Sequence, residues 1–246
     1  GDLFSRLGFA RKNMRSLESL DFDNDRALMR VDFNVPMSEG KVADDFRIQA
    51  ALPSIKHCID HGASVVLMSH LGRPGGVPLE DLSLMPVGEI LCDHLEMSIK
   101  FSQDCVSDDA IDVSHELQPG EVHLLENLRF HIGETKNDHD FASRLAQHGT
   151  CFINDAFGTA HRAHASNVGV TDFLQNCTPG FLMAEEFKFL HSALIRPKRP
   201  FTIVLGGAKI GTKLPLLPRF IRQADNVMIG GGMAFTFLKM AGYNIG

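Results

Sequence analysis

The segment ALMRVDFNVP, residues 27–36, passes from a short apolar stretch directly into polar residues and a proline. A nearly continuous apolar run of this length is typical of a strand buried on both faces of a parallel sheet. Ligands of such sheets bind beyond the carboxyl ends of the strands. The segment therefore predicts a central strand, Ala27–Val31, followed by the edge of a ligand site at Asp32 and Asn34.

Strands and helices are predicted to alternate along the rest of the chain. Apolar stretches predict further strands at Ser64–Met68, Val122–Leu125, Cys151–Ile153, Phe201–Leu205 and Asn226–Ile229. Helical spacing predicts helices at Arg47–His61, Pro86–Leu95, Asp138–Gln147, Ala184–Leu194, Leu216–Gln223 and Gly232–Met240. This alternation predicts an α/β fold: a Rossmann-like parallel sheet with helices on both faces, followed by the start of a second α/β nucleotide domain.

The first predicted helix carries conflicting signals. Asp44 or Asp45 is expected to cap its start, and Gly62 suits a left-handed residue at its end. Pro53 lies inside the pattern, so the helix either begins later or kinks there.

The length of 246 residues suggests between one and two domains. The segment IRPKRP, residues 195–200, is a poor helix or strand interior and marks the best boundary. We expect residues 1–13 to be a leader or an expression remnant and 14–183 to form an N-terminal domain. We expect 184–200 to be a connecting helix and linker, and 201–246 to be the beginning of a second domain that is cut short.

Composition excludes several classes of protein. Hydrophobic residues make up 44% and charged residues 22%, which argues against disorder and coiled coil. The net charge of −6 argues against a broad nucleic-acid surface. The five cysteines are widely spaced and form no CxxC pair, so neither a disulfide framework nor a zinc site is indicated. No apolar stretch approaches the ~20 residues of a membrane helix. We expect a cytoplasmic protein with no nucleic-acid or membrane partner.

Polar residues follow four of the predicted strands. The candidate site residues in these loops and at the start of the first helix are Asp32, Asn34, Arg47, His70, Arg73, Arg129 and Arg162. Several guanidinium groups at one rim predict a small, strongly anionic ligand, because each matches a carboxylate or phosphate. A surface salt bridge is the alternative for any single arginine, and a structural role stays open for His70 and His161. Asp155 is a candidate brace for an arginine, and the spacing of His161 and His164 does not indicate a metal site.

Two glycine-rich segments follow the last two predicted strands. LGGAKIGTK, residues 205–213, lies where backbone N–H groups at a helix start can hold phosphate, with Lys209 and Lys213 four residues apart. It nearly matches a P-loop, but Thr212 precedes Lys213, so a P-loop NTPase is rejected. In GGGMA, residues 230–234, close approach to a nucleotide and a simple tight turn remain equal alternatives.

Six segments in this order resemble the phosphoglycerate kinase family. They are RVDFNVP (30–36), SHLGRP (69–74), LLENLRF (124–130), NDAFGTAHRAHAS (154–166), LGGAKIGTK (205–213) and GGGMA (230–234). The resemblance implies reversible phosphoryl transfer between 1,3-bisphosphoglycerate and ADP, giving 3-phosphoglycerate and MgATP in glycolysis and gluconeogenesis. It also implies Mg²⁺ as a cofactor, two domains that close about a hinge, and a monomer when full length.

The resemblance also implies roles for individual residues. The implied substrate-binding residues are Asp32, Asn34, Arg47, His70, Arg73, Arg129 and Arg162. The implied nucleotide-binding residues are Gly207, Ala208, Lys209, Lys213, Gly230 and Gly231. Arg47, Lys209 and Lys213 are the implied catalytic residues, because they would touch the transferring phosphoryl group or the nucleotide phosphates.

The chain departs from the family by ending at Gly246. The carboxylate that helps to hold the magnesium nucleotide is expected beyond that residue, so no metal ligand is assigned within the chain. We expect an intact phosphoglycerate pocket and slow turnover, if any. The alternative is a non-catalytic fragment that only binds phosphoglycerate or self-associates.

Overall fold

The computed structural model describes residues 16–20, 22–195, 197–206 and 217–245. The chain divides into two compact units between Glu186 and Phe187. The division lies inside helix α7 (Phe181–Ile195), within the segment 184–200 that the sequence predicts as a connector. Residues 1–13, predicted as a leader or remnant, lie outside the described residues.

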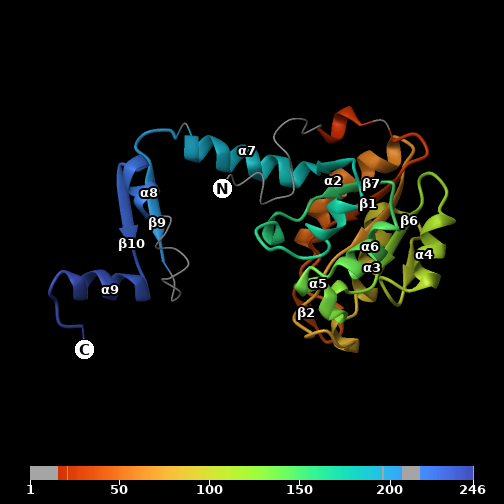
Figure 1. Cartoon of the computed structure of the whole chain (residues 1–246), viewed down its shortest axis with the longest axis horizontal. Helices are drawn as coiled ribbons and strands as arrows, with labels where there is room; N and C mark the ends of the chain where they lie inside the picture. Colours follow the sequence, from red (N-terminus) through yellow and green to blue (C-terminus); the bar gives the residue numbers. More distant parts are fainter. Residues whose placement is uncertain (1–15, 21, 196, 207–216, 246) are drawn as a thin grey trace. The chain divides into compact units, whose positions relative to one another are not determined.

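The first unit is built on a parallel sheet of six strands in the order β5-β6-β4-β1-β7-β8. Figure 1 labels β1, β6 and β7 of this sheet. The strands are β1 (Arg26–Arg30), β4 (Ser64–Met68), β5 (Lys100–Ser102), β6 (Val122–Leu125), β7 (Cys151–Asn154) and β8 (Cys177–Pro179). Leu28 of β1 is in register with Val66 of β4 on one side and Phe152 of β7 on the other. The predicted parallel sheet is confirmed, and β1 lies inside it.

Two hydrophobic cores cover the two faces of this sheet. Successive residues of a strand face opposite sides, so Met29 and Leu28 of β1 belong to different cores. Met29 packs with residues of α2 (Phe46–Asp60) and α3 (Met85–Leu95), whereas Leu28 packs with residues of α6 (His139–Ala146). The prediction of helices on both faces is therefore confirmed.

Several short elements have no counterpart in the predicted set. They are α4 (Asp108–His115), α5 (Ile132–Lys136), the hairpin β2 (Met37–Ser38) with β3 (Lys41–Val42), and the 3₁₀ turns η1 (Leu17–Ser19), η2 (Glu80–Leu82), η3 (Leu128–Phe130), η4 (Phe157–Thr159) and η5 (Gly169–Asp172). The edge strands β5 and β8 are also missing from the prediction. Each has only three residues, too few to show the apolar run of an inner strand.

Helix α2 resolves the alternatives around Pro53. It begins at Phe46 and runs through Pro53 to Asp60, so a later start is wrong. The Asp44 carboxylate accepts a hydrogen bond from the Phe46 N–H at 2.8 Å. Asp45 occupies the N-cap position without a side-chain cap bond. Gly62 has φ +88°, which confirms the left-handed residue predicted just beyond the helix.

The second unit holds a parallel pair of strands, β9 (Thr202–Leu205) and β10 (Asn226–Ile229), with Leu205 in register with Ile229. Helices α8 (Leu217–Gln223) and α9 (Gly232–Met240) lie on either side of β10 in sequence (Figure 1). This pattern fits the predicted start of a second α/β domain. None of the described helices is both long and apolar enough to span a membrane.

Candidate active site

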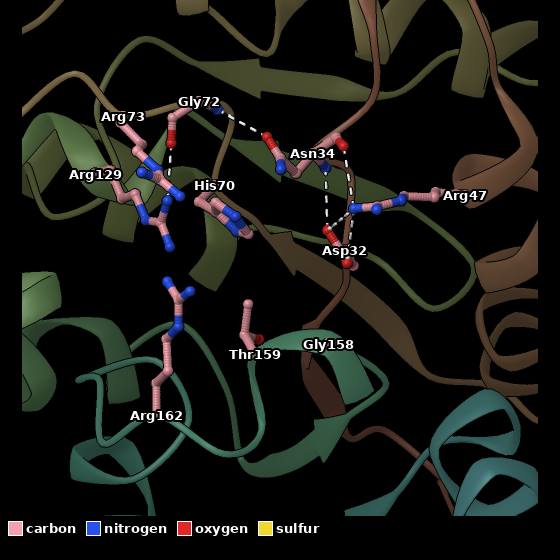
Figure 2. A pocket seen from close by; sticks show the side chains of 10 residues that line it. All are labelled: Asp32, Asn34, Arg47, His70, Gly72, Arg73, Arg129, Gly158, Thr159 and Arg162. Atoms are coloured by element: carbon pink, nitrogen blue, oxygen red, sulfur yellow. Dashed lines mark hydrogen bonds and ion pairs between the residues drawn. The ribbon is translucent and has the colours of Figure 1, made fainter. Parts of the chain in front are cut away.

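A pocket of about 270 Å³ opens at the carboxyl ends of the strands of the first unit (Figure 2). Its lining includes every residue that was predicted to bind substrate: Asp32, Asn34, Arg47, His70, Arg73, Arg129 and Arg162. Gly72, Gly158 and Thr159, which were not predicted as site residues, complete the lining. The loops after β1, β4, β6 and β7 supply all of them except Arg47, which is the second residue of α2. The predicted convergence of these side chains is confirmed.

One side of the pocket is organised around Asp32. Arg47 Nη1 donates to the two Asp32 carboxylate oxygens at 3.1 and 3.0 Å and to the Asn34 carbonyl at 3.1 Å. The Asn34 N–H also donates to Asp32 Oδ1 at 3.2 Å. These bonds hold the Arg47 side chain in one orientation, although it is 48% exposed.

The opposite side of the pocket carries three arginines that we call the arginine cluster: Arg73, Arg129 and Arg162 (Figure 2). In the described part of the chain, no carboxylate forms an ion pair with any of them. Burial and the neighbouring Arg30 and Arg162 lower the pKa of Arg129, and its Nε is buried without a hydrogen-bond partner. Cations that lack a partner in the protein indicate an anionic ligand.

Gly72 links the two sides of the pocket. Its N–H donates to Asn34 Oδ1 at 2.8 Å, and its carbonyl accepts from Arg129 Nη1 at 2.8 Å. Its φ is +64°, and a Cβ at this position would lie 2.8 Å from Leu82 Cδ2. A larger residue would therefore meet both an unfavourable backbone conformation and a steric clash.

His70 and His161, whose roles the sequence does not decide, occupy different positions relative to the pocket. The His70 ring lines the pocket and is hydrogen-bonded to Arg30, so it is both a pocket residue and a structurally held one. Burial, with Arg30 and Arg129 nearby, lowers the pKa of His70 to about 2, which keeps it neutral at ordinary pH. His161 does not line the pocket; its Nε2 accepts from Arg162 Nε at 3.4 Å.

A second hollow of about 260 Å³ adjoins the first and shares the whole arginine cluster with it. Its other lining residues are Gly75, Gly76, His131, Thr135 and His164. Arg73, Arg129 and Arg162 therefore line both hollows. Their charge is available to an anion without displacing a side chain of the core.

The prediction that Asp155 braces an arginine is wrong. Its carboxylate accepts instead from the Met183 N–H at 3.2 Å, in the first turn of α7. Burial raises the pKa of Asp155, and its Oδ2 is buried without a hydrogen-bond partner. Asp155 thus joins the loop after β7 to α7 and does not contribute to the pocket.

One cluster in the described residues has metal-ligand chemistry, formed by Asp104, Cys105 and His131 with ligand atoms within 4.8 Å of one another. Its geometry is that of a hydrogen bond between His131 and Asp104 beside a core thiol. His131 Nε2 lies 2.5 Å from Asp104 Oδ1, which leaves no room for an ion between them. Burial raises the pKa of Cys105, so its thiol stays protonated and is a poor ligand.

The nucleotide-binding prediction can be placed only in part. Gly207, Ala208, Lys209 and Lys213 lie outside the described residues. Gly230 follows β10, and a Cβ on it would meet no atom within 4 Å. Gly231 is the N-cap of α9 with φ +62° and ψ −155°, a conformation essentially confined to glycine. The turn therefore requires glycine at 231, whereas the backbone at 230 is open.

Comparison with known proteins gives a consistent result. The family model for phosphoglycerate kinase matches residues 17–246. A phosphoglycerate kinase of Chloroherpeton thalassium is 46% identical over 232 residues, which are 94% of this chain and 58% of that protein. One from Finegoldia magna is 47% identical over 236 residues, which are 95% of this chain and 60% of that protein. The chain thus spans 58–60% of the length of these curated relatives.

Solved structures agree with the sequence relatives. The structure of phosphoglycerate kinase from Coxiella burnetii has a TM-score of 0.82 and 38% identity, covering 95% of this chain and 59% of that one. The crystal structure of phosphoglycerate kinase from Pyrococcus horikoshii OT3 has a TM-score of 0.81 and 34% identity, with the same coverage of 95% and 59%. The α/β fold is therefore shared with these proteins.

Proposed function

This chain belongs to the phosphoglycerate kinase family, and from that membership we propose that its first unit binds 3-phosphoglycerate for phosphoryl transfer with ATP and ADP. The observation that carries the proposal is the pocket, where four guanidinium groups surround one hollow in a protein of net charge −6. A charge of that density suits a small molecule that carries both a phosphate and a carboxylate.

The proposed ligand matches the two sides of the pocket. The arginine cluster and His70 offer donors to the phosphate end, and none of the described carboxylates forms an ion pair with the cluster. Asp32 and Asn34 can hold the ligand hydroxyl. Arg47, oriented by Asp32, would then stand beside the carboxylate that receives the phosphoryl group. This arrangement neutralises charge at both ends of one small anion.

Transfer to an ionised carboxylate requires no general base. It requires alignment of the reacting atoms and neutralisation of the charge on the migrating group. Arg47 would supply a fixed positive charge on the substrate side. We assign Lys209, Lys213 and the backbone of Gly207, Ala208, Gly230 and Gly231 to the nucleotide phosphates, as an extension of the same proposal.

Mg²⁺ does not fit the residues of the pocket. The only carboxylate in its lining is Asp32, and the charge of that group is already paired with Arg47. Oxygen ligands dominate magnesium sites, whereas arginines dominate here. We therefore propose that any magnesium arrives with the nucleotide and derive no step from it.

Calorimetric titration of the 246-residue chain with 3-phosphoglycerate tests the proposal. We expect binding, and about tenfold weaker binding of glycerol 3-phosphate, which lacks the carboxylate. Arg162→Ala should weaken binding of 3-phosphoglycerate more than Arg47→Ala does. Arg144→Ala is the matched control, because Arg144 pairs with Asp108 away from the pocket. Absence of heat with millimolar 3-phosphoglycerate would contradict the proposal.

A second candidate function is self-association through the second unit. Val204 and Met228 are paired in register on β9 and β10, and they are 73% and 59% exposed. Neighbouring exposed apolar residues favour association. Light scattering after size-exclusion chromatography distinguishes the two functions. A monomer that binds 3-phosphoglycerate supports only the first, whereas a dimer disrupted by Val204→Lys supports the second.

We also propose a cytoplasmic location. The five cysteines are free, and Cys58, Cys105 and Cys151 are buried, as is usual where thiols stay reduced. Fractionation of cells that produce the protein checks this assignment.

A further inference from the structure

Arg30, the last residue of β1, is fully buried and is not part of the pocket lining. Its Nε donates to Ser166 Oγ at 2.9 Å, and its Nη1 donates to the Val31 carbonyl. Its Nη2 lies 2.9 Å from Nδ1 of His70. The guanidinium therefore bonds directly to the back of a residue that lines the pocket.

The bond between Arg30 and His70 has only one direction. All guanidinium nitrogens are donors, so Nδ1 of His70 must accept. An accepting Nδ1 carries no proton, and a neutral imidazole then carries its proton on Nε2. With Nδ1 held by Arg30, Nε2 is the ring nitrogen left for the pocket, where Figure 2 shows His70 between the arginine cluster and Asp32.

A buried cation needs compensation, and Glu134 supplies it through Ser166. Glu134 is fully buried. Ser166 donates to it twice, from Oγ to Oε1 at 2.6 Å and from its N–H to Oε2 at 3.0 Å. Because the Ser166 proton goes to Glu134, its oxygen lone pairs are free to accept from Arg30. Arg30 thus donates in two directions: to Ser166, which passes the interaction on to Glu134, and to His70.

We propose that Arg30 is a positioning residue that holds His70 in the Nε2–H tautomer, so that His70 presents a neutral donor to an anion in the pocket. In the other tautomer a lone pair would face the pocket and repel the same anion. The tautomer itself is a property of the free protein. Its consequence for phosphoglycerate rests on the proposed function.

The tautomer can be read directly by NMR. In the 246-residue chain with ¹⁵N-labelled histidine, long-range ¹H–¹⁵N correlations distinguish a protonated ring nitrogen from an unprotonated one. The His70 signals are assigned by their loss in His70→Gln. We expect Nδ1 unprotonated and Nε2 protonated at pH 7 and at pH 5. A protonated Nδ1 at pH 7, in either the neutral or the charged ring, would overturn the proposal.

Arg30→Met removes the donors and keeps much of the side-chain volume. We expect His70 to populate both tautomers and to titrate nearer its usual range, with 3-phosphoglycerate affinity about tenfold weaker. Arg26→Met is the matched control. Arg26 is at the other end of β1 and donates to the His148 carbonyl, so its loss should change neither the tautomer nor the affinity.

A purely structural role for Arg30 would lower stability and leave the His70 tautomer unchanged, and that result would overturn the proposal. If Arg30→Met does not fold, Ser166→Ala gives the same information. It removes the hydroxyl that accepts from Arg30 Nε, so His70 should partly populate the second tautomer. Wild-type protein with the expected tautomer but no affinity for 3-phosphoglycerate would disprove the proposed function and leave the positioning role intact.

Discussion

Two polar groups of the first unit differ in how their polar atoms are satisfied. One is the arginine cluster, and the other is a buried chain of serines and histidines between α4 and strands β5 and β6, which we call the serine–histidine chain. The chain consists of Ser102, His123, Ser114 and His148. Both of its histidines are fully buried, and no charged group is needed to complete it. The arginine cluster is charged throughout and leaves Arg129 Nε without a partner.

Every proton in the serine–histidine chain can be assigned. The Cys105 carbonyl can only accept, so His148 Nε2 donates to it, at 2.9 Å. Ser114 must then donate to His148 Nδ1, at 2.6 Å, and accept from His123 Nδ1, at 2.8 Å. Ser102 completes the chain by donating to His123 Nε2, at 2.7 Å. Four bonds run in one direction with both rings neutral.

The difference separates polar groups that stabilise the fold from polar groups that await a ligand. A fully satisfied buried network contributes to stability and loses much if one member is removed. The adjacent cations of the cluster form no ion pair with a described carboxylate and repel one another, so an anion bound between them would relieve that repulsion. Removing a member of each group should therefore have opposite consequences for stability and for binding.

The largest effect is expected from Ser114→Ala. The substitution leaves His123 Nδ1–H and His148 Nδ1 buried without partners, at a cost of roughly 2–5 kcal/mol in the free energy of unfolding. Urea unfolding measures it, and affinity for 3-phosphoglycerate should be retained by the folded protein. Ser19→Ala is the control, because Ser19 is exposed and its hydroxyl donates to the nearby Ser16 carbonyl. Equal effects of the two substitutions would refute the assigned stabilising role of the serine–histidine chain.

Arg129→Met should give the reverse pattern. Loss of a charge-assisted contact weakens binding of 3-phosphoglycerate by roughly 10–100-fold. The free energy of unfolding should change by less than about 1 kcal/mol, because relief of repulsion within the cluster offsets the lost bond to Gly72. Calorimetry and urea unfolding of the same variant check both halves. A large loss of stability with normal affinity would reverse the comparison.

Acid should weaken the fold through the serine–histidine chain. Burial lowers the pKa of His148 to about 4 and that of His123 to about 3, from 6.5. The unfolded protein binds these protons at a higher pH than the folded protein does. The contribution of the two neutral histidines to the free energy of unfolding is therefore complete above pH 6.5 and is lost as pH falls toward their pKa values in the folded state. Depressed pKa values of His70 and His164 act in the same direction.

His148→Gln tests this contribution, because glutamine can donate to the Cys105 carbonyl and accept from Ser114 but does not titrate. Between pH 6.5 and pH 5 the wild type should lose about 1–2 kcal/mol more than the variant. Urea unfolding at the two pH values gives the difference. Parallel losses in both proteins would show that His148 is not a source of the acid sensitivity.

The smallest effect is expected from Lys100→Ala. Lys100 forms an ion pair with Glu121 at 3.3 Å next to the chain, but both side chains are about 40% exposed, at 41% and 39%. Exposed pairs contribute less than about 1 kcal/mol and are screened by salt. Unfolding at low and high ionic strength measures the contribution of this ion pair to the free energy of unfolding. A loss as large as that of Ser114→Ala would show that charge at the edge of the sheet matters more than satisfied burial.

The inner part of the fold follows from the sequence by itself. The runs that form β1, β4, β6 and β7 are mostly apolar because both faces of an inner strand are buried, although Arg30 and His123 are buried polar exceptions. Their bounds differ from prediction by one residue at most. Polar loops then follow the strands, and parallel strands bring their carboxyl ends to one edge. For this reason Asp32, Arg73 and Arg162 could be assigned to one pocket before any contact was known.

Only the tertiary structure decided which polar group meets which. Arg30 contacts Ser166 across 136 positions, and nothing in the local pattern of either segment indicates the other. The same holds for Asp155, whose carboxylate accepts from the Met183 N–H of α7 and does not brace an arginine. It also holds for the edge strands β5 and β8. Periodicity records which side of an element is buried. The partner of a buried polar atom depends on strand order and side-chain rotamers, which are set when distant segments pack together.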